Sequence, residues 1–148
     1  MDLNAECKAL QGVPAFRDVD IAKLKLLAMT SQLAAYGPGD TLLKQGDKAD
    51  AVYVILDGEA DVVRQTPTGQ IKIARLSKGM LIGDTGVLTG NNHQITTVTV
   101  SPVTALRIER NTFLELFKEI PQLALAIARE LGHRIERLHE VLAERHNT

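Results

Sequence analysis

The sequence has little of what marks secreted, membrane or nucleic-acid-binding proteins. Cys7 is the single cysteine among 148 residues, which excludes an intramolecular disulfide and a metal cluster held by several thiolates. No stretch approaches the roughly 18 apolar residues of a membrane-spanning helix. The 17 basic and 18 acidic side chains nearly cancel, so there is no overall field to attract phosphate backbones or anionic membranes. We therefore expect a cytoplasmic protein with neither nucleic acid nor membrane as a partner.

What the sequence does have is enough apolar content, 45%, for the core of one domain over residues 1–148. After Asp20, a capping residue, the apolar residues Ile21, Leu24 and Leu27 follow a helical spacing. Helical spacing returns after Glu109, and it predicts two C-terminal helices over about residues 111–145 that are separated near Pro121.

Between about residues 30 and 110 the pattern is that of a β-structure. Short apolar runs alternate with turn residues, as expected for antiparallel strands. The clearest runs are β-branched or alternate apolar with polar residues, and they cover 51–56, 60–63, 71–74 and 96–100. About eight short strands predict a mainly β fold, an antiparallel jelly-roll β-barrel with flanking helices.

The last helix carries an apolar stripe, which comprises Leu123, Ile127, Leu131, Ile135, Leu138 and Leu142. One face is therefore meant for burial. Part of the stripe also fits a heptad seam, although it is shorter than a coiled coil normally requires. We expect this face to pack on the barrel in preference to forming a dimer.

The segment Gly83–Leu88 follows a short apolar run and precedes a polar loop. If a helical turn starts at Asp84, its free N–H groups form a ready site for an anion such as phosphate. The same residues are equally typical of a capped turn in any protein. From this segment alone, both interpretations stay open.

Taken together, these features resemble the cyclic-nucleotide-binding domains of bacterial catabolite activators, protein kinase A regulatory subunits and gated channels. The similarity spans roughly Leu10 to Leu142. It rests on the segments Val13–Phe16, Tyr36–Asp40, Gln45–Asp47, Tyr53–Gly58 and Gly83–Asp84. The resemblance implies a regulatory domain for signal transduction, with a short cassette helix that holds the phosphate of a cyclic nucleotide, cAMP by default, and with no other cofactor and no metal. The ligand-binding residues that it implies are Ile82, Gly83, Asp84, Thr85, Gly86, His93, Gln94, Ile95, Thr96, Thr97, Arg134 and Leu138.

Two of these positions depart from the family pattern. Asp84 stands where the family has a glutamate for the ribose 2′-hydroxyl, and Gln94 stands where it has an arginine for the cyclic phosphate. A neutral bond in place of a charge-assisted one weakens binding by roughly 5- to 30-fold. The N–H groups of Thr85 and Gly86, the hydroxyls of Thr96 and Thr97, and a protonated His93 would recover part of this loss. His93 is otherwise expected to be an exposed loop histidine.

The resemblance also gives roles to two residues of the last helix. It places Arg134 against Asp84, and it places Leu138 over the base. The alternative for Arg134 is a surface ion pair with Glu130 or Glu136. For Leu138, a core-facing position is favoured over a dedicated base lid.

Three hypotheses on function follow. The first is a cyclic-nucleotide sensor that signals through the C-terminal helix, the second is a degenerate dimerisation or docking module, and the third is a sensor of another ligand such as a cyclic dinucleotide. Catalysis is not expected, because Asp57, Glu59 and Asp61 fit solvated side chains and no catalytic triad is recognisable. The sequence ends at Thr148, so we expect no DNA-binding domain, and either a homodimer or an output domain in a longer parent chain would relay the signal.

Overall fold

Two four-stranded antiparallel sheets form the centre of the computed structural model, which describes residues 2–146. The first sheet has the order β1 (Gln32–Tyr36), β8 (Val103–Glu109), β3 (Ala51–Asp57), β6 (Leu81–Ile82). The second has the order β2 (Thr41–Leu43), β7 (Thr96–Thr99), β4 (Ala60–Thr66), β5 (Gly69–Leu76). The predicted mainly β class with flanking helices is confirmed. Within residues 2–146 the hydrogen bonds join the strands into two sheets and do not close a barrel.

Strand β3 explains how the layers are held together. Successive side chains of a strand point to opposite faces of its sheet. Those of even number from Val52 to Leu56 belong to the core under the helices, whereas those of odd number from Ala51 to Ile55 belong to the core between the sheets. A strand that is buried on both faces needs an unbroken apolar run, which is the pattern that predicted this strand.

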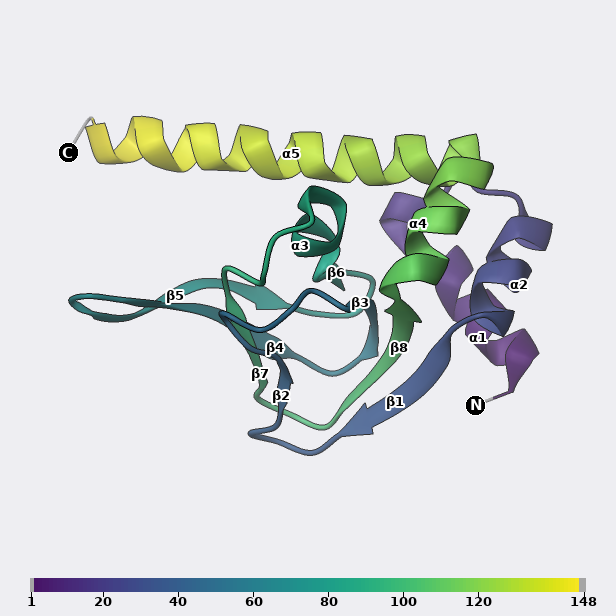
Figure 1. The fold of residues 1–148 in the computed structure, drawn as a ribbon, viewed down its shortest axis with the longest axis horizontal. Helices are drawn as coiled ribbons and strands as arrows, with labels where there is room; N and C mark the ends of the chain where they lie inside the picture. Colours follow the sequence, from purple (N-terminus) through teal and green to yellow (C-terminus); the bar gives the residue numbers. More distant parts are fainter. Residues whose placement is uncertain (1, 147–148) are drawn as a thin grey trace.

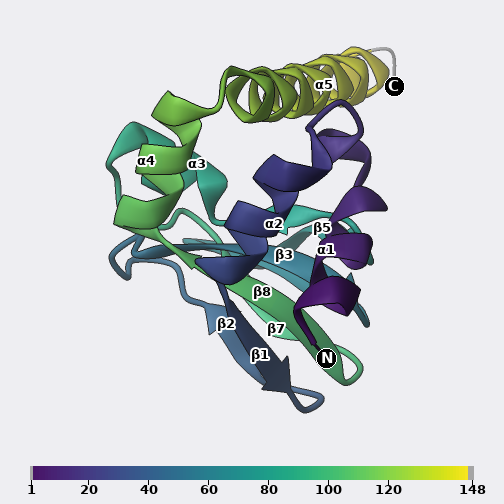
Figure 2. The same cartoon turned by 90° about the vertical axis from the view of Figure 1, so that its right-hand side faces the viewer.

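The helices cover the outer face of the first sheet (Figures 1 and 2). They are α1 (Leu3–Gln11), the 3-10 turn η1 (Pro14–Phe16), α2 (Ile21–Met29), α4 (Arg110–Glu119) and α5 (Pro121–His146). The sequence pattern did not predict α1, which Asp2 caps by accepting a hydrogen bond of 2.8 Å from the Ala5 N–H. No helix in the described part of the chain is long and apolar enough to cross a bilayer.

The predicted boundaries of the other helices agree with the structure, with one difference in detail. Helix α2 begins directly after Asp20, but the Asp20 side chain makes no capping hydrogen bond. Pro121 is the first residue of α5, where the N–H that proline lacks would have had no partner within the helix.

Helix α5 is only half covered, so the prediction that its whole apolar stripe packs on the sheets is wrong. Ile127 is fully buried and Leu131 partly so, whereas Ile135, Leu138 and Leu142 are 53%, 58% and 62% exposed. The reason is length, since 26 residues at about 1.5 Å each span roughly 39 Å. Figure 1 shows the outer half of α5 running past α3 (Asp84–Thr89) and above the β4–β5 hairpin.

Candidate functional site

The turn from β6 into α3 depends on Gly83. Its φ of 91° lies in the left-handed region, and a Cβ there would lie 2.7 Å from the carbonyl oxygen of Ala51. The first intrahelical bond runs from the Val87 N–H to the Gly83 carbonyl at 3.2 Å. The N–H groups of the three residues before Val87 therefore precede the helical bonding pattern and are available at the start of α3. The conditional prediction of a helical turn beginning at Asp84 is confirmed.

Asp84 is the buried acid of this segment, at 1% exposure. Its Oδ1 accepts a hydrogen bond of 3.1 Å from Nη1 of Arg134, while its Oδ2 has no hydrogen-bond partner within residues 2–146. Arg134 also donates through Nη2 to the carbonyl oxygen of Leu81 at 3.4 Å. This cation therefore joins α5 to both β6 and α3.

Of the three partners that the sequence suggested for Arg134, two are present, Asp84 and Glu130. Besides Asp84, Glu130 lies near, with 3.7 Å between Arg134 Nε and Glu130 Oε1. Glu136 instead faces His133 across 3.6 Å. The pair with Asp84 differs from an ordinary surface pair, because one member is almost fully removed from water.

The two threonines of β7 differ in how their hydroxyls are used. Thr96 Oγ1 accepts a hydrogen bond of 2.9 Å from the Gln45 N–H. Thr97 is 0% exposed, and its Oγ1 has no partner in the described part of the chain. Buried polar atoms without partners are rare and call for an explanation, and a role in binding a polar ligand is one. Thr97 and Asp84 each leave one such atom.

His93 is not the exposed loop histidine that the sequence suggested. It is 5% exposed and lies beneath α3, with Cε1 at 3.6 Å from where a Cβ of Gly83 would be and Nδ1 at 3.3 Å from that of Gly86. Burial lowers the pKa of His93, and Asp50 and Asp47 oppose this only in part. Burial thus works against the protonated form that His93 would need to supply a positive charge.

The side chains of Gln94 and Ile95 lie in different surroundings. Gln94 is exposed, and its Nε2 donates to the carbonyl oxygen of Asn92 at 3.3 Å. Ile95 is partly buried against the core between the sheets, as is Ile82 of β6. A further neighbour, which the sequence analysis missed, is Arg64 of β4, whose Nη1 donates to the Gln94 carbonyl oxygen at 3.4 Å. Only the strand pairing brings this residue to the cassette.

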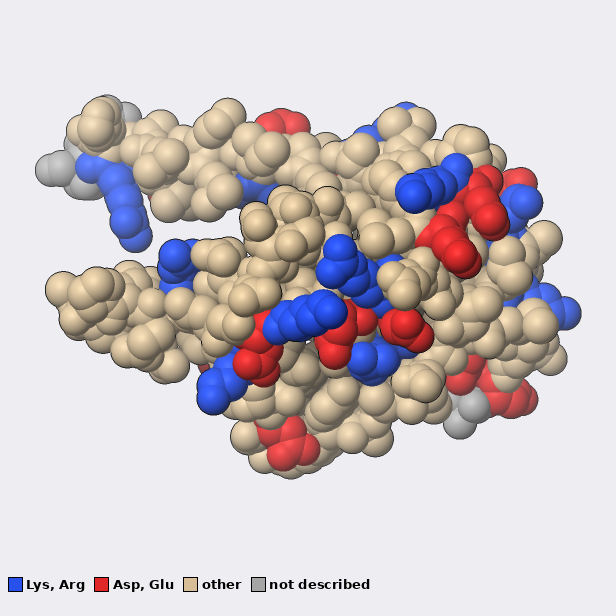
Figure 3. Space-filling view, in the orientation of Figure 1, with Lys and Arg blue, Asp and Glu red and all other residues tan. Residues whose placement is uncertain are grey.

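The position of Leu138 also differs from the expectation. Its exposed side chain belongs to the outer half of α5, so the core-facing interpretation is wrong. Figure 3 shows a hollow between this part of α5 and the tip of the β4–β5 hairpin, and Figure 1 places α3 at the inner end of that space. Thr85 is the exposed second residue of α3. It belongs to the cassette, which comprises the turn at Gly83 and helix α3.

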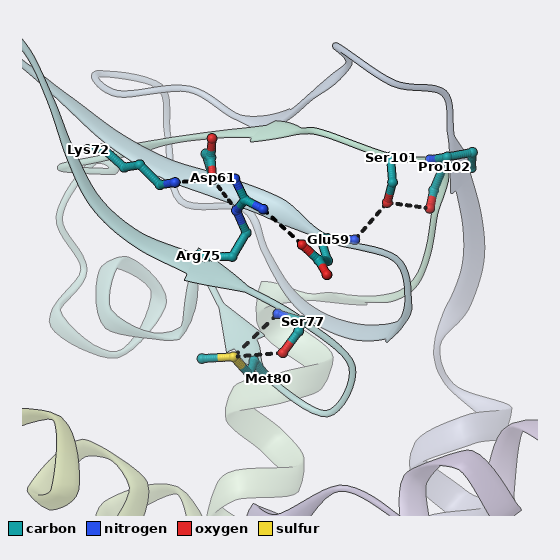
Figure 4. Close-up of polar contacts among 8 residues, drawn as sticks. All are labelled: Glu59, Asp61, Lys72, Arg75, Ser77, Met80, Ser101 and Pro102. Carbon is teal, nitrogen blue, oxygen red and sulfur yellow. Dashed lines mark hydrogen bonds and ion pairs between the residues drawn. The ribbon is translucent and has the colours of Figure 1, made fainter.

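Two acidic residues at the start of β4, Glu59 just before the strand and Asp61 within it, take part in surface ion pairs, as Figure 4 shows. Asp61 accepts from Arg75 and lies 3.2 Å from Lys72 Nζ, and Glu59 Oε2 lies 2.9 Å from Arg75 Nη1. The hydrogen bond from Arg75 is the main cause of the lowered pKa of Asp61. Ser101 accepts from the Glu59 N–H at 2.9 Å, which ties this end of β4 to the loop before β8. The carboxylates of Glu59 and Asp61 are thus engaged in ion pairs with cations of β5.

Comparison with known proteins gives a match to one family model. The model of the cyclic nucleotide-binding domain matches residues 33–120, which is more than half of the chain. The match includes both sheets, α3 and α4.

Individual relatives are more distant. An uncharacterised NTE family protein of Mycobacterium bovis is 28% identical over 127 residues, which cover 86% of this chain and 21% of that protein. The cyclic AMP receptor protein of Thermus thermophilus is 26% identical over 127 residues, covering 85% of this chain and 59% of the relative. The crystal structure of the Thermus thermophilus catabolite activator protein superposes with a TM-score of 0.80 at 24% identity, over 88% of this chain and 62% of that one. The chain thus spans between about a fifth and three fifths of the length of these relatives.

Proposed function

Because the chain belongs to the cyclic nucleotide-binding domain family, we propose that it is a regulatory sensor that binds a cyclic nucleotide, with cAMP as the first candidate. One observation supports this most strongly. Asp84, at the position of the family's ribose-binding acid, is buried, is held by Arg134 through one carboxylate oxygen, and leaves the other oxygen without a partner. A ribose hydroxyl is a suitable donor for that oxygen.

The remaining roles follow from the chemistry of the cassette. Gly83 lets the backbone turn sharply into α3, and the N–H groups of Thr85 and Gly86 would donate to the phosphate. Thr97 offers a buried hydroxyl that has no partner within residues 2–146. Gln94 contributes an amide where a cation would bind phosphate more strongly.

Signalling would use the link between Asp84 and α5. A ligand hydroxyl that bonds to Asp84 changes the electrostatic environment of Arg134, which is the residue that ties α5 to the cassette. Binding would then favour one position of α5 over another, because the ligand makes different contacts in the two positions. The receiver would be a second copy of the chain or an output domain in a longer cytoplasmic protein.

A second function is favoured by the outer half of α5. Ile135, Leu138 and Leu142 expose an apolar stripe, which suits a dimerisation or docking module that needs no ligand. Sedimentation tests this alternative, because Leu138→Asp would turn a dimer into a monomer if the stripe is the contact.

Calorimetric titration with cAMP, cyclic GMP and a cyclic dinucleotide separates the hypotheses. We expect saturable one-to-one binding of a cyclic mononucleotide. Tighter binding of the cyclic dinucleotide would assign the pocket to another ligand. Absence of both heat and a thermal shift at millimolar ligand would contradict the sensor and leave the docking module.

A further inference from the structure

Given the function proposed above, we propose that Arg64 of β4 supplies the positive charge that Gln94 lacks. The cassette then binds an anionic ligand through a cation that comes from the neighbouring strand. Arg64 would thereby determine whether the pocket prefers a cyclic nucleotide to an uncharged nucleoside.

The strand register places Arg64 beside the cassette. β4 pairs with β7 as far as Val63 opposite Thr96, so Arg64 lies one residue further along, next to the approach to β7. There its Nη1 reaches the carbonyl oxygen of Gln94 at 3.4 Å. A guanidinium group thus lies beside the backbone of Gln94, the residue that lacks the expected charge.

The direction of the side chain follows from its neighbours on the same strand. Val62, two residues earlier, is buried in the core between the sheets, and side chains two apart on a strand share a face. Arg64 and its cross-strand partner Ile71 therefore lie on the inner face of the hairpin, at the exposed end beyond the covered core. This is the end of the hairpin that borders the hollow beneath α5 (Figure 3).

Arg64 forms no ion pair within residues 2–146, whereas the other two cations of the β4–β5 hairpin do. Lys72 and Arg75 are paired with Asp61 and Glu59 (Figure 4). Arg64 has no carboxylate within 4.0 Å in the part of the chain that the structure describes, and its hydrogen bond to Gln94 uses one of five N–H donors. The remaining donors suit the planar, two-pronged recognition of a phosphate.

The test compares a charged ligand with an uncharged one of the same base and sugar. Arg64→Gln should weaken cAMP binding by about tenfold and leave adenosine binding unchanged, because only cAMP carries a phosphate. Lys72→Gln is the matched control, since it removes one positive charge from the same hairpin but from a residue paired with Asp61. It should change neither affinity.

A rescue variant separates a charge effect from a structural one. In the Arg64→Gln background, Gln94→Arg should restore cAMP binding to the wild-type level or better. Unchanged cAMP binding in Arg64→Gln, equal weakening of cAMP and adenosine, or failure of the rescue would each overturn the role of Arg64 while leaving the sensor intact. If the wild-type protein binds neither cAMP nor adenosine, the proposed function falls together with this inference.

Discussion

The two ends of α5 carry the same kind of apolar stripe in very different surroundings. At the inner end, Leu123 and Ile127 are enclosed by the N-terminal helices, α4 and the first sheet. At the outer end, Ile135 and Leu142 are exposed, and Figure 1 shows this half of α5 above the β4–β5 hairpin. The spacing of apolar residues therefore predicts that a helix forms and which of its sides is apolar. How much of that side is buried depends on the extent of the sheets and helices that lie against it.

The two ends of α5 therefore contribute differently to the protein. The inner end stabilises the fold, because burial of apolar surface contributes about 25 cal/mol per Å². The outer end borders the hollow (Figure 3) and leaves its apolar side chains exposed. Arg134 lies between the two ends and holds the helix to Asp84, which is why the proposed signal would pass between the cassette and α5 at this residue.

The largest expected effect contrasts the two ends directly. Ile127→Ala should lower the free energy of unfolding by about 2–5 kcal/mol, since it opens a cavity at a fully buried position. Leu142→Ala, the matched change at the exposed end, should alter it by less than about 0.5 kcal/mol. Urea denaturation of the two variants measures both values. Similar losses would mean that the outer end is covered in solution.

The next effect concerns Arg134, which lies between the two ends of α5. Arg134→Ala leaves the Asp84 carboxylate buried without its cation, which should lower the free energy of unfolding by about 1–3 kcal/mol. Arg137→Ala removes a neighbouring, exposed arginine whose partner is Glu130, and it should have an effect below about 0.5 kcal/mol. The same denaturation experiment compares them. Equal effects would show that the pair with Asp84 is no stronger than a surface contact.

The smallest effect concerns His93, which supports α3 between the two ends. Its pKa in the folded protein is lowered by burial, so the unfolded chain binds a proton more readily. Stability from this residue is therefore complete above the unfolded pKa of about 6.5 and is lost as the pH falls below it. Between about pH 7.5 and 5.5, wild type should therefore lose more stability than His93→Gln in urea denaturation at each pH. Parallel stability curves for the two proteins would show that His93 is not buried as a neutral ring.

Much of the fold could be predicted from local patterns, because the spacing of apolar residues along the sequence determines which side chains must be buried. The unbroken run of β3 required a strand covered on both faces, and Pro121 marked the start of the last helix. Helix α1 was missed, because its buried side chains, Cys7 and Leu10, are few within a polar segment.

The site divides in the same way. The turn at Gly83 and the helix that begins at Asp84 could be predicted because a glycine before a short helical turn has a local signature, whereas their role in binding came from the resemblance to the family. The burial of His93 and the approach of Arg64 to Gln94 were not found, because both arise where segments distant in sequence pack together. No spacing along one strand reveals which loop its side chains will reach.

The most direct test of the account is to remove the hydroxyl that Asp84 is proposed to bind. Wild-type protein is titrated calorimetrically with cAMP and with 2′-deoxy-cAMP, and the comparison is repeated with Asp84→Asn. We predict that wild type prefers cAMP by about tenfold, as expected for a hydrogen bond to a charged group, and that the variant loses most of this preference. Equal affinity of the wild-type protein for the two nucleotides would contradict the assignment of Asp84 as the ribose-binding residue.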